Sequence, residues 1–366
     1  MTTNTVPKKP QAALMVPPFV VFYLVHSMQV GVGILGFTRY ISEIAGYRAW
    51  MSVLLTGVLF HMVVWVIYQL LNDQEKDLIS IHKRAFGKWI GGFLTFIFLI
   101  YVTLLAVTVL RTYIEIVQVW IFPDLQTWTI SISIILIVYY ALVHGFRVVA
   151  GVCFLGVVVP FFLFLTALAP LEFATPRNLL PLFDTSLKVQ IEATKAMTLS
   201  FLGPELLLIY YPFIQEPRKS QKFAQFGILF TVFLYLFITI ISFVFYSEKQ
   251  LATTIWPTLS AWKVFELPFI ERFEYLGIAT WMFVILPNIT LGLWAASRVL
   301  KRQMNITHKK SIPIICLIAF ILSINFQTRE HIDLLNTYVS KAGTYIVYFY
   351  LPILLLILTI IRRLKK

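Results

Sequence analysis

The feature that most constrains this chain is a series of ten long apolar runs separated by short polar segments. A run of about 20 apolar residues lets one helix cross the hydrocarbon core of a bilayer. Only 13% of the 366 residues are charged, which is too few to cover a soluble protein of this length. The sequence therefore predicts an all-α membrane protein with about ten transmembrane helices. The runs occupy residues 13–44, 48–71, 89–121, 127–145, 148–170, 188–214, 222–247, 272–298, 311–327 and 339–361.

The positive charge of the chain is distributed unevenly between the predicted loops. A net charge of +13 in a soluble protein would suggest binding to nucleic acid. Here most Lys and Arg residues fall on one side when the N-terminus is placed inside, for example Lys8, Arg84, Lys219, Arg302 and Lys365. Basic loops stay in the cytoplasm. We therefore expect both termini in the cytoplasm, the lipid bilayer as a partner and no nucleic acid.

Two of the ten runs contain residues that break a helix. The first contains Gly31-Val32-Gly33-Ile34-Leu35-Gly36, and the sixth contains Phe201-Leu202-Gly203-Pro204-Glu205. Glycine supports unwound backbone, and proline removes a backbone donor and disfavours helical geometry at the preceding residue. Packing of small residues between helices is an alternative explanation for the glycines alone.

The two breaks occupy the same position in two halves of five runs. This pattern predicts an inverted repeat within one integral membrane domain (1–366), with a first repeat at about 13–170 and a second at about 188–361. Backbone groups freed at a break cannot face lipid, but they can face a cavity and a polar ligand. The N-terminus of a half-helix favours a carboxylate, and freed carbonyls accept from an ammonium group. A zwitterionic amino acid suits both.

Several polar residues within the runs are candidates for a function or for a structural role. Glu205 beside the second break contacts a ligand or, alternatively, holds the unwound backbone through hydrogen bonds. Asn288 and Thr290 follow Pro287 and either line the cavity or, as we favour, satisfy carbonyls freed by a proline kink. Arg111 and Glu115 are four residues apart, so they are expected to pair near the outer end.

Other features limit the classes of function. The basic stretch 72–88 is either an amphipathic helix on the inner leaflet or an ordinary charged loop. Lys188, Glu192 and Lys195 predict a solvated outer mouth. The two cysteines lie in separate runs, and the sequence contains no catalytic constellation. We expect no enzyme activity, no metal and no cofactor.

Several short motifs resemble those of one family, the spore germination receptor B subunits of endospore-forming bacteria. The charged pair Arg111 and Glu115 and the basic C-terminus match as well, and the resemblance covers essentially the whole chain. The motifs are Phe86-Gly87-Lys88-Trp89-Ile90-Gly91, Ser200-Phe201-Leu202-Gly203-Pro204-Glu205, Ile255-Trp256-Pro257-Thr258 and Phe269-Ile270-Glu271-Arg272-Phe273-Glu274.

The resemblance implies a fold, a site and a biological setting. The family belongs to the amino acid–polyamine–organocation superfamily, which has a leucine-transporter-like fold with five-plus-five inverted repeats. It implies a subunit that senses a nutrient germinant, usually an amino acid, in the spore inner membrane together with an A subunit and a lipoprotein C subunit. By position in that fold, the ligand-binding residues would be Gly31, Gly33, Tyr101, Leu105, Leu202, Gly203 and Glu205.

Two alternative functions share this fold. Some proton-coupled relatives carry a lysine in the fifth span, but the run Val148–Pro170 contains no lysine and no acid, which mildly favours a sensor. The first alternative is a secondary amino acid permease that completes an alternating-access cycle. The second is a purely structural membrane subunit with a vestigial pocket.

Overall fold

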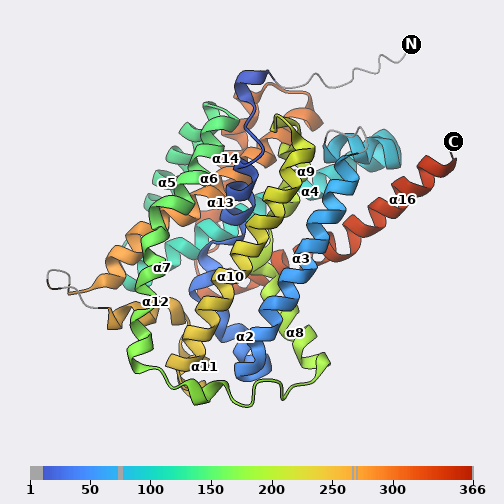
Figure 1. Cartoon of the computed structure of the whole chain (residues 1–366). Coiled ribbons are helices and arrows are strands. Elements are labelled where there is room, and N and C mark those ends of the chain that lie inside the picture. Colours follow the sequence, from blue (N-terminus) through green and yellow to red (C-terminus); the bar gives the residue numbers. More distant parts are fainter. Residues whose placement is uncertain (1–10, 73–76, 266–267, 269–270, 365–366) are drawn as a thin grey trace, which may run out of the picture.

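The predicted helical architecture is confirmed by a computed structural model that describes residues 11–72, 77–265, 268 and 271–364 (Figure 1). Within these residues the chain forms helices and no β-strand, apart from an isolated parallel bridge between Val16 and Ile214. Residues 269 and 270, which begin one of the sequence motifs, lie outside the described part of the chain.

The main helices follow the ten apolar runs in order. They are α1 (Val20–Gln29), α2 (Phe37–Ala45), α3 (Trp50–Leu71), α4 (Leu78–Trp120), α5 (Thr127–Val143), α6 (Phe146–Val158), α7 (Phe162–Thr166), α8 (Leu187–Thr198), α9 (Leu207–Tyr210), α10 (Gln221–Phe245), α13 (Phe273–Met304), α14 (His308–Asn325), α15 (Arg329–Tyr345) and α16 (Leu351–Leu364). Two short helices, α11 (Glu248–Thr253) and α12 (Pro257–Ala261), lie between α10 and α13.

Shorter helical turns connect or extend these helices. The 3₁₀ turns are η1 (Ala12–Leu14), η2 (Val32–Leu35), η3 (Gly46–Ala49), η4 (Val159–Phe161), η5 (Ala169–Phe173), η6 (Pro176–Leu179), η7 (Leu199–Phe201), η8 (Pro204–Leu206), η9 (Tyr211–Phe213), η10 (Pro217–Ser220) and η11 (Trp262–Val264). A π-helical turn, η12 (Ile346–Tyr350), joins α15 to α16.

The helices are long and apolar enough for a membrane protein. Among the described residues, seven helices can cross a bilayer by length and composition, and the bent pair Leu187–Phe201 and Pro204–Phe213 brings the number to eight. Two further apolar helices, Val20–Gln29 and Thr127–Val143, are shorter. Large apolar side chains such as Met62, Trp89 and Phe93 expose more than half of their surface, as expected where lipid covers a protein.

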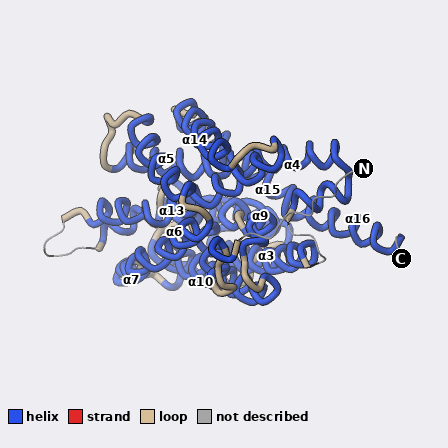
Figure 2. The backbone as a smooth tube through the Cα atoms, turned by 90° about the horizontal axis from the view of Figure 1, so that it is seen from above, coloured by secondary structure: helices blue, strands red, loops and turns tan. Residues whose placement is uncertain are grey.

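Helix α13 lies in the interior of the bundle, with other helices on both sides. Seen from above in Figure 2, α7 and α10 lie on one side of it, and α5 and α14 lie on the other. It is also among the most deeply buried of the long apolar helices. The two interrupted helices pack beside it, so their breaks lie inside the protein and not against lipid.

Both predicted interruptions are present. In the first segment, α1 ends at Gln29 and helical structure resumes with η2 at Val32. In the sixth, η7 ends at Phe201, Gly203 adopts a φ of 128°, and the axis bends by 50° before η8 continues from Pro204. The large positive φ explains why a glycine is needed at this point, because a side chain there would be strained.

The third segment starts earlier than the hydropathy pattern suggested. Helix α4 begins at Leu78, with the Asp77 side chain capping it through the backbone N–H of Ser80, and it extends to Trp120. A non-helical residue, Gly87 with a φ of 74°, separates its basic first part from its apolar part. The basic stretch 72–88 is therefore mostly helical, and residues 73–76 lie outside the described part.

The two ends of the molecule differ in how tightly they are closed. At the end where η1 lies, at the top of Figure 1, the backbone N–H of Val16 donates to the carbonyl of Phe213 at 2.9 Å, and Gln215 donates back to Val16 at 2.9 Å. Arg302 pairs with Asp77 at the same end. We call this the terminal end, because it carries the N-terminal turn. The opposite end, where α2, α8 and α11 lie, is called the α2 end.

Candidate functional site

A cavity of about 700 Å³ is lined by residues of both breaks and extends to Arg39 and Tyr40 of α2. One face of α4, formed by Leu105, Thr108, Val109 and Thr112, lines it, because residues three and four apart share a face of a helix. The breaks supply the facing wall, and α15 supplies the remaining side. A cavity of this size accommodates a nutrient-sized molecule together with water.

Three residues that line the cavity carry buried polar atoms without hydrogen-bond partners within the described residues. The side chains of Gln29, Thr112 and Asn288 are 2%, 3% and 1% exposed and all line the cavity. Gln29 Oε1, Thr112 Oγ1 and Asn288 Oδ1 have no hydrogen-bond partner within the described residues. An unsatisfied buried acceptor costs roughly 1–3 kcal/mol, so these atoms favour a ligand or water that donates to them.

The orientation of the two amides follows from their other contacts. Gln29 Nε2 donates to the carbonyl of Phe201 at 3.0 Å, and Asn288 Nδ2 donates to the carbonyls of Ser27 and Met28 at 2.7 and 2.9 Å. A carbonyl oxygen only accepts, so the amide nitrogen must face it and the amide oxygen must face away. Two buried acceptor oxygens, on residues that line the cavity, therefore remain without partners within the described residues.

The first break and its surroundings contribute hydrogen-bond donors and positive charge. The first backbone N–H groups of a helix have no partner within the helix, and η2 begins at Val32 beside the lining residues Gly31 and Gly33. Two basic side chains, Lys195 and Lys341, also line the cavity and form no ion pair within the described residues. These groups favour an anion, and the prediction of a solvated mouth near Lys195 agrees with its place in the lining.

Four of the seven residues predicted to bind the ligand line this cavity: Gly31, Gly33, Leu105 and Leu202. The glycines permit close contact between elements. A Cβ atom on Gly31 would lie 3.0 Å from Asn288 Oδ1, and one on Gly33 would lie 3.0 Å from Ser200 Oγ. Side chains at these positions would therefore compete with a ligand for space.

The other three predicted residues, Tyr101, Gly203 and Glu205, lie behind the cavity wall. Glu205 is fully buried, and its carboxylate accepts from the Tyr101 hydroxyl at 2.6 Å and from the backbone N–H of Gly203 at 2.8 Å. The carboxylate thus fastens the unwound backbone of the sixth segment to α4. This arrangement matches the alternative role considered for Glu205 from the sequence.

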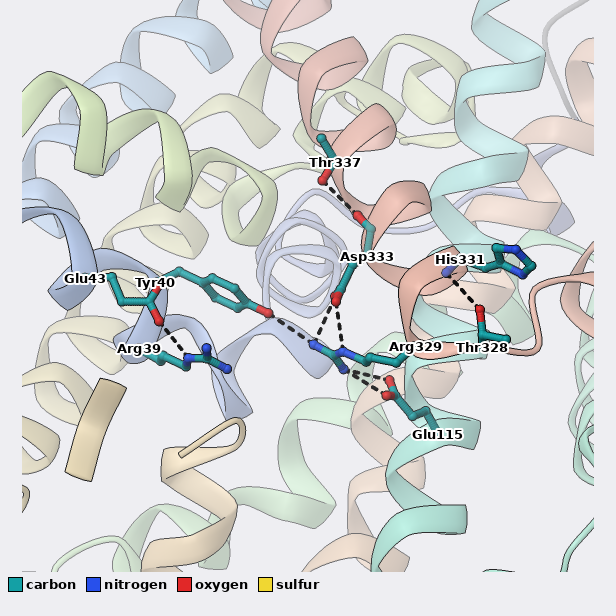
Figure 3. A network of polar contacts seen from close by, with 9 residues as sticks. All are labelled: Arg39, Tyr40, Glu43, Glu115, Thr328, Arg329, His331, Asp333 and Thr337. Carbon is teal, nitrogen blue, oxygen red and sulfur yellow. Dashed lines mark hydrogen bonds and ion pairs between the residues drawn. The ribbon is translucent and has the colours of Figure 1, made fainter. Parts of the chain in front are cut away.

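A network of charged side chains crosses the cavity near the α2 end (Figure 3). Arg329 of α15 donates to both carboxylate oxygens of Glu115 on α4, at 3.0 and 2.8 Å, and to the Tyr40 hydroxyl on α2 at 3.3 Å. It also pairs with Asp333 on its own helix, and its guanidinium lies 5.5 Å from the centre of the Trp256 ring. One arginine therefore joins three helices and a loop.

The sequence-based pairing of Arg111 with Glu115 is wrong. Glu115 pairs with Arg329, while Arg111 donates to the carbonyls of Phe326 and Gln327 at the end of α14. Both residues share a face of α4, as predicted, but Glu115 has its partner on α15 and Arg111 has its partners just after α14. A spacing of four residues permits an ion pair and does not require it.

The favoured interpretation of Asn288 is also wrong. Its amide does not serve carbonyls freed by Pro287 in its own helix, because it donates to Ser27 and Met28 at the end of α1. Sequence reasoning missed Gln29 and Thr112 as candidate site residues. Gln29 stands two residues before the glycine-rich break, so a polar residue at the end of an apolar run was an available signal.

Comparison with known proteins identifies relatives over nearly the full chain. The family described as "Spore germination protein" matches residues 15–332. "Spore germination protein GerQB" of Bacillus cereus is 44% identical over 351 residues, which cover 96% of this chain and 98% of that protein. "Spore germination protein YndE" of Bacillus subtilis (strain 168) is 25% identical and covers 92% of this chain and 94% of its own length.

Two solved structures have a similar fold. A Na⁺-coupled sialic acid symporter, in a substrate-bound outward-open state, has a TM-score of 0.59 at 11% identity, over 96% of this chain and 78% of that protein. MhsT in complex with L-phenylalanine has a TM-score of 0.58 at 14% identity, over 94% and 97%. At such low identity the likeness shows the fold alone, which is the leucine-transporter-like fold of a membrane protein.

Proposed function

Since the chain belongs to the spore germination protein family, we propose that it is the germinant-sensing membrane subunit of a spore germination receptor and that its ligand is an amino acid. The observation that carries this proposal is the chemistry of the cavity between the two breaks. It combines two buried amide oxygens without partners, on Gln29 and Asn288, with the beginning of η2.

The two ends of an amino acid match these groups. Its ammonium group donates to Gln29 Oε1 and Asn288 Oδ1, which lie on α1 and α13. Its carboxylate accepts from backbone N–H groups at the start of η2, which have no partner within that turn. Lys195 and Lys341 attract anions toward this position from the α2 end. MhsT, which shares the fold, is described in complex with L-phenylalanine.

In this proposal the ligand acts by stabilising one arrangement of the interrupted helices. A ligand shifts a conformational equilibrium only through different affinities for the two states. The bound state would be passed to partner subunits, a receptor A subunit and a lipoprotein C subunit, in the spore inner membrane. Both termini would lie in the cytoplasm, so the cavity would open outward.

The test combines a gene deletion with a variant of the cavity. Deletion should abolish germination, followed as loss of refractility, in response to one amino acid within a panel of amino acids, sugars and nucleosides. Gly31→Val places a side chain against Asn288 Oδ1 and should weaken the response to that amino acid at least about tenfold, equal to about 1.4 kcal/mol.

Gly151→Val is the matched control, because a Cβ atom on Gly151 meets no atom within 4 Å. It should give the response of the unchanged protein, with equal amounts of subunit in the membrane. A normal dose response with Gly31→Val would exclude this cavity as the germinant site. Loss of a sugar or nucleoside response alone would exclude an amino acid as the ligand.

The permease alternative has support from the fold and from the cavity. The cavity reaches residues of the α2 end, while backbone contacts close the terminal end, as in one state of an alternating-access cycle. Uptake of the labelled amino acid by proteoliposomes that contain only this chain would support a permease. Binding without uptake would support the receptor.

A further inference from the structure

The carbonyl groups at the end of α1 all have neutral partners from the protein. Ser27 and Met28 accept from Asn288 Nδ2, and Gln29 accepts from the Tyr235 hydroxyl at 2.9 Å. The last carbonyls of a helix lack partners within the helix and carry partial negative charge. In this chain uncharged side chains from α13 and α10 supply those partners.

The second break shows the same arrangement. The carbonyl of Ser200 accepts from the shared Tyr235 hydroxyl at 3.3 Å, and the carbonyl of Phe201 accepts from Gln29 Nε2 at 3.0 Å. Tyr235 is fully buried, as is Asn288 apart from 1% of its surface. Neutral amides and a hydroxyl therefore satisfy the carbonyls that end both half-helices.

Neutral donors at these carbonyls bear on whether the protein needs a bound cation at the breaks. In secondary transporters with interrupted helices, exposed carbonyls at such ends commonly coordinate the coupling cation, which also holds neighbouring helices together. An amide N–H at 2.7–2.9 Å occupies the space and the lone pairs that a cation would use. Asn288 also connects α13 to α1, which is the mechanical role of such a cation.

We propose that Asn288 replaces a coupling cation at the end of α1, so that this chain keeps its ligand-binding arrangement without Na⁺. Asn288 acts as a positioning residue through Nδ2, which fixes the end of α1, while its buried Oδ1 has no partner within the described residues. A contact of Oδ1 with a ligand rests on the proposed function. The replacement of a cation by Nδ2 is independent of it.

The first experiment measures the melting temperature of the purified full-length protein without any ligand, in NaCl, KCl and choline chloride of equal ionic strength. The unchanged protein should melt at the same temperature in all three salts. A melting temperature that rises with Na⁺ relative to choline would overturn the proposal. This outcome needs no variant, and it is independent of whether the germinant is an amino acid.

The second experiment converts the amide into a cation ligand. Asn288→Asp removes the two N–H donors and adds a carboxylate beside two free carbonyl oxygens, a set of oxygen ligands that favours a hard cation. Cation binding to the folded state alone raises its stability. Na⁺ should therefore raise the melting temperature of this variant by an amount on the order of 2–4 °C over choline.

Asn325→Asp is the matched control, because it makes the same chemical change at an exposed position at the end of α14. It should show no difference between Na⁺ and choline. A variant Asn288→Asp that is as indifferent to Na⁺ as this control would contradict the idea that the amide fills a cation position. If Asn288→Asp does not fold, the salt comparison on the unchanged protein still decides the proposal.

Discussion

Single residues at the second break hold a conformation that other residues cannot adopt. Gly203 has a φ of 128°, and a Cβ atom there would lie 2.4 Å from the Cβ atom of Met28. Its backbone N–H and the hydroxyl of Tyr101 share one buried carboxylate, that of Glu205. Gly203, Glu205 and Tyr101 thus hold the break in place by contacts with one another. These contacts lie behind the cavity wall and do not involve the ligand.

We expect Gly203→Ala to destabilise the folded protein, although Gly203 does not line the cavity. The strained backbone and the contact with Met28 should cost about 1–3 kcal/mol or more. The measurement is the melting temperature in detergent, with Gly151→Ala as a control whose added methyl group meets no neighbour within 4 Å. Equal melting temperatures for the two variants would contradict the expectation.

The hydrogen bond from Tyr101 should be worth more than a similar bond to a neutral acceptor. Tyr101→Phe removes a donor to a buried carboxylate, which should cost about 1.5–3 kcal/mol. Tyr113→Phe is the matched control on the same helix, because its hydroxyl donates to the neutral carbonyl of Ile278 and should contribute about 0.5–1.5 kcal/mol. Thermal unfolding compares them, and a larger loss for Tyr113→Phe would argue against the role given to Glu205.

At the scale of elements, Arg329 connects three helices near the α2 end. It links α15 to α4 through Glu115 and to α2 through Tyr40. By contrast, the pair Arg39–Glu43 lies within α2 and joins no second element. In Figure 3, Arg329 therefore makes the contacts between helices, to Glu115 and Tyr40, while the ion pairs Arg329–Asp333 and Arg39–Glu43 lie within one helix each.

We expect Glu115→Gln to loosen the α2 end and to admit solutes faster. A thiol introduced by Leu105→Cys reports access to the cavity, after the buried Cys153 and Cys316 have been replaced by alanine. Glu115→Gln should raise the labelling rate of this thiol, since it removes a charge-assisted pair between two helices. Glu43→Gln, which breaks only the pair within α2, should leave the rate unchanged. Equal rates in both variants would exclude a clamping role for Arg329.

At the scale of the whole molecule, the distribution of basic residues predicts which end of the cavity faces the cytoplasm. Arg298 and Arg302 lie at the terminal end, where the guanidinium of Arg298 packs 4.8 Å from the centre of the Phe213 ring. Basic residues favour the cytoplasmic side. The closed end would then face the cytoplasm, and the cavity would be reached from outside.

Labelling of single cysteines in intact cells tests this orientation. A membrane-impermeant maleimide should label Asp184→Cys, in the exposed segment before α8, without permeabilisation. It should label Asn305→Cys, in the turn between α13 and α14, only after permeabilisation. The reverse pattern would place the basic end outside and the cavity opening inside.

Much of the architecture follows from the sequence by itself, because hydropathy and chain length limit what a bilayer permits. The number of helical segments, their order and the interruptions of the first and sixth segments all follow from local composition. Gly203 and Pro204 predict a break because their backbone preferences are properties of those residues alone. The boundaries of the two repeats and the orientation in the membrane remain predictions.

Only the tertiary structure decided which polar groups meet. Local spacing suggested that Arg111 pairs with Glu115 and that Asn288 serves its own helix, yet both make their bonds to distant segments. The same packing placed Glu205 behind the cavity wall and Gln29 and Thr112 within it. The physical reason is that successive side chains point in directions about 100° apart around a helix axis. Only the packing of neighbouring helices determines which of these side chains face a cavity.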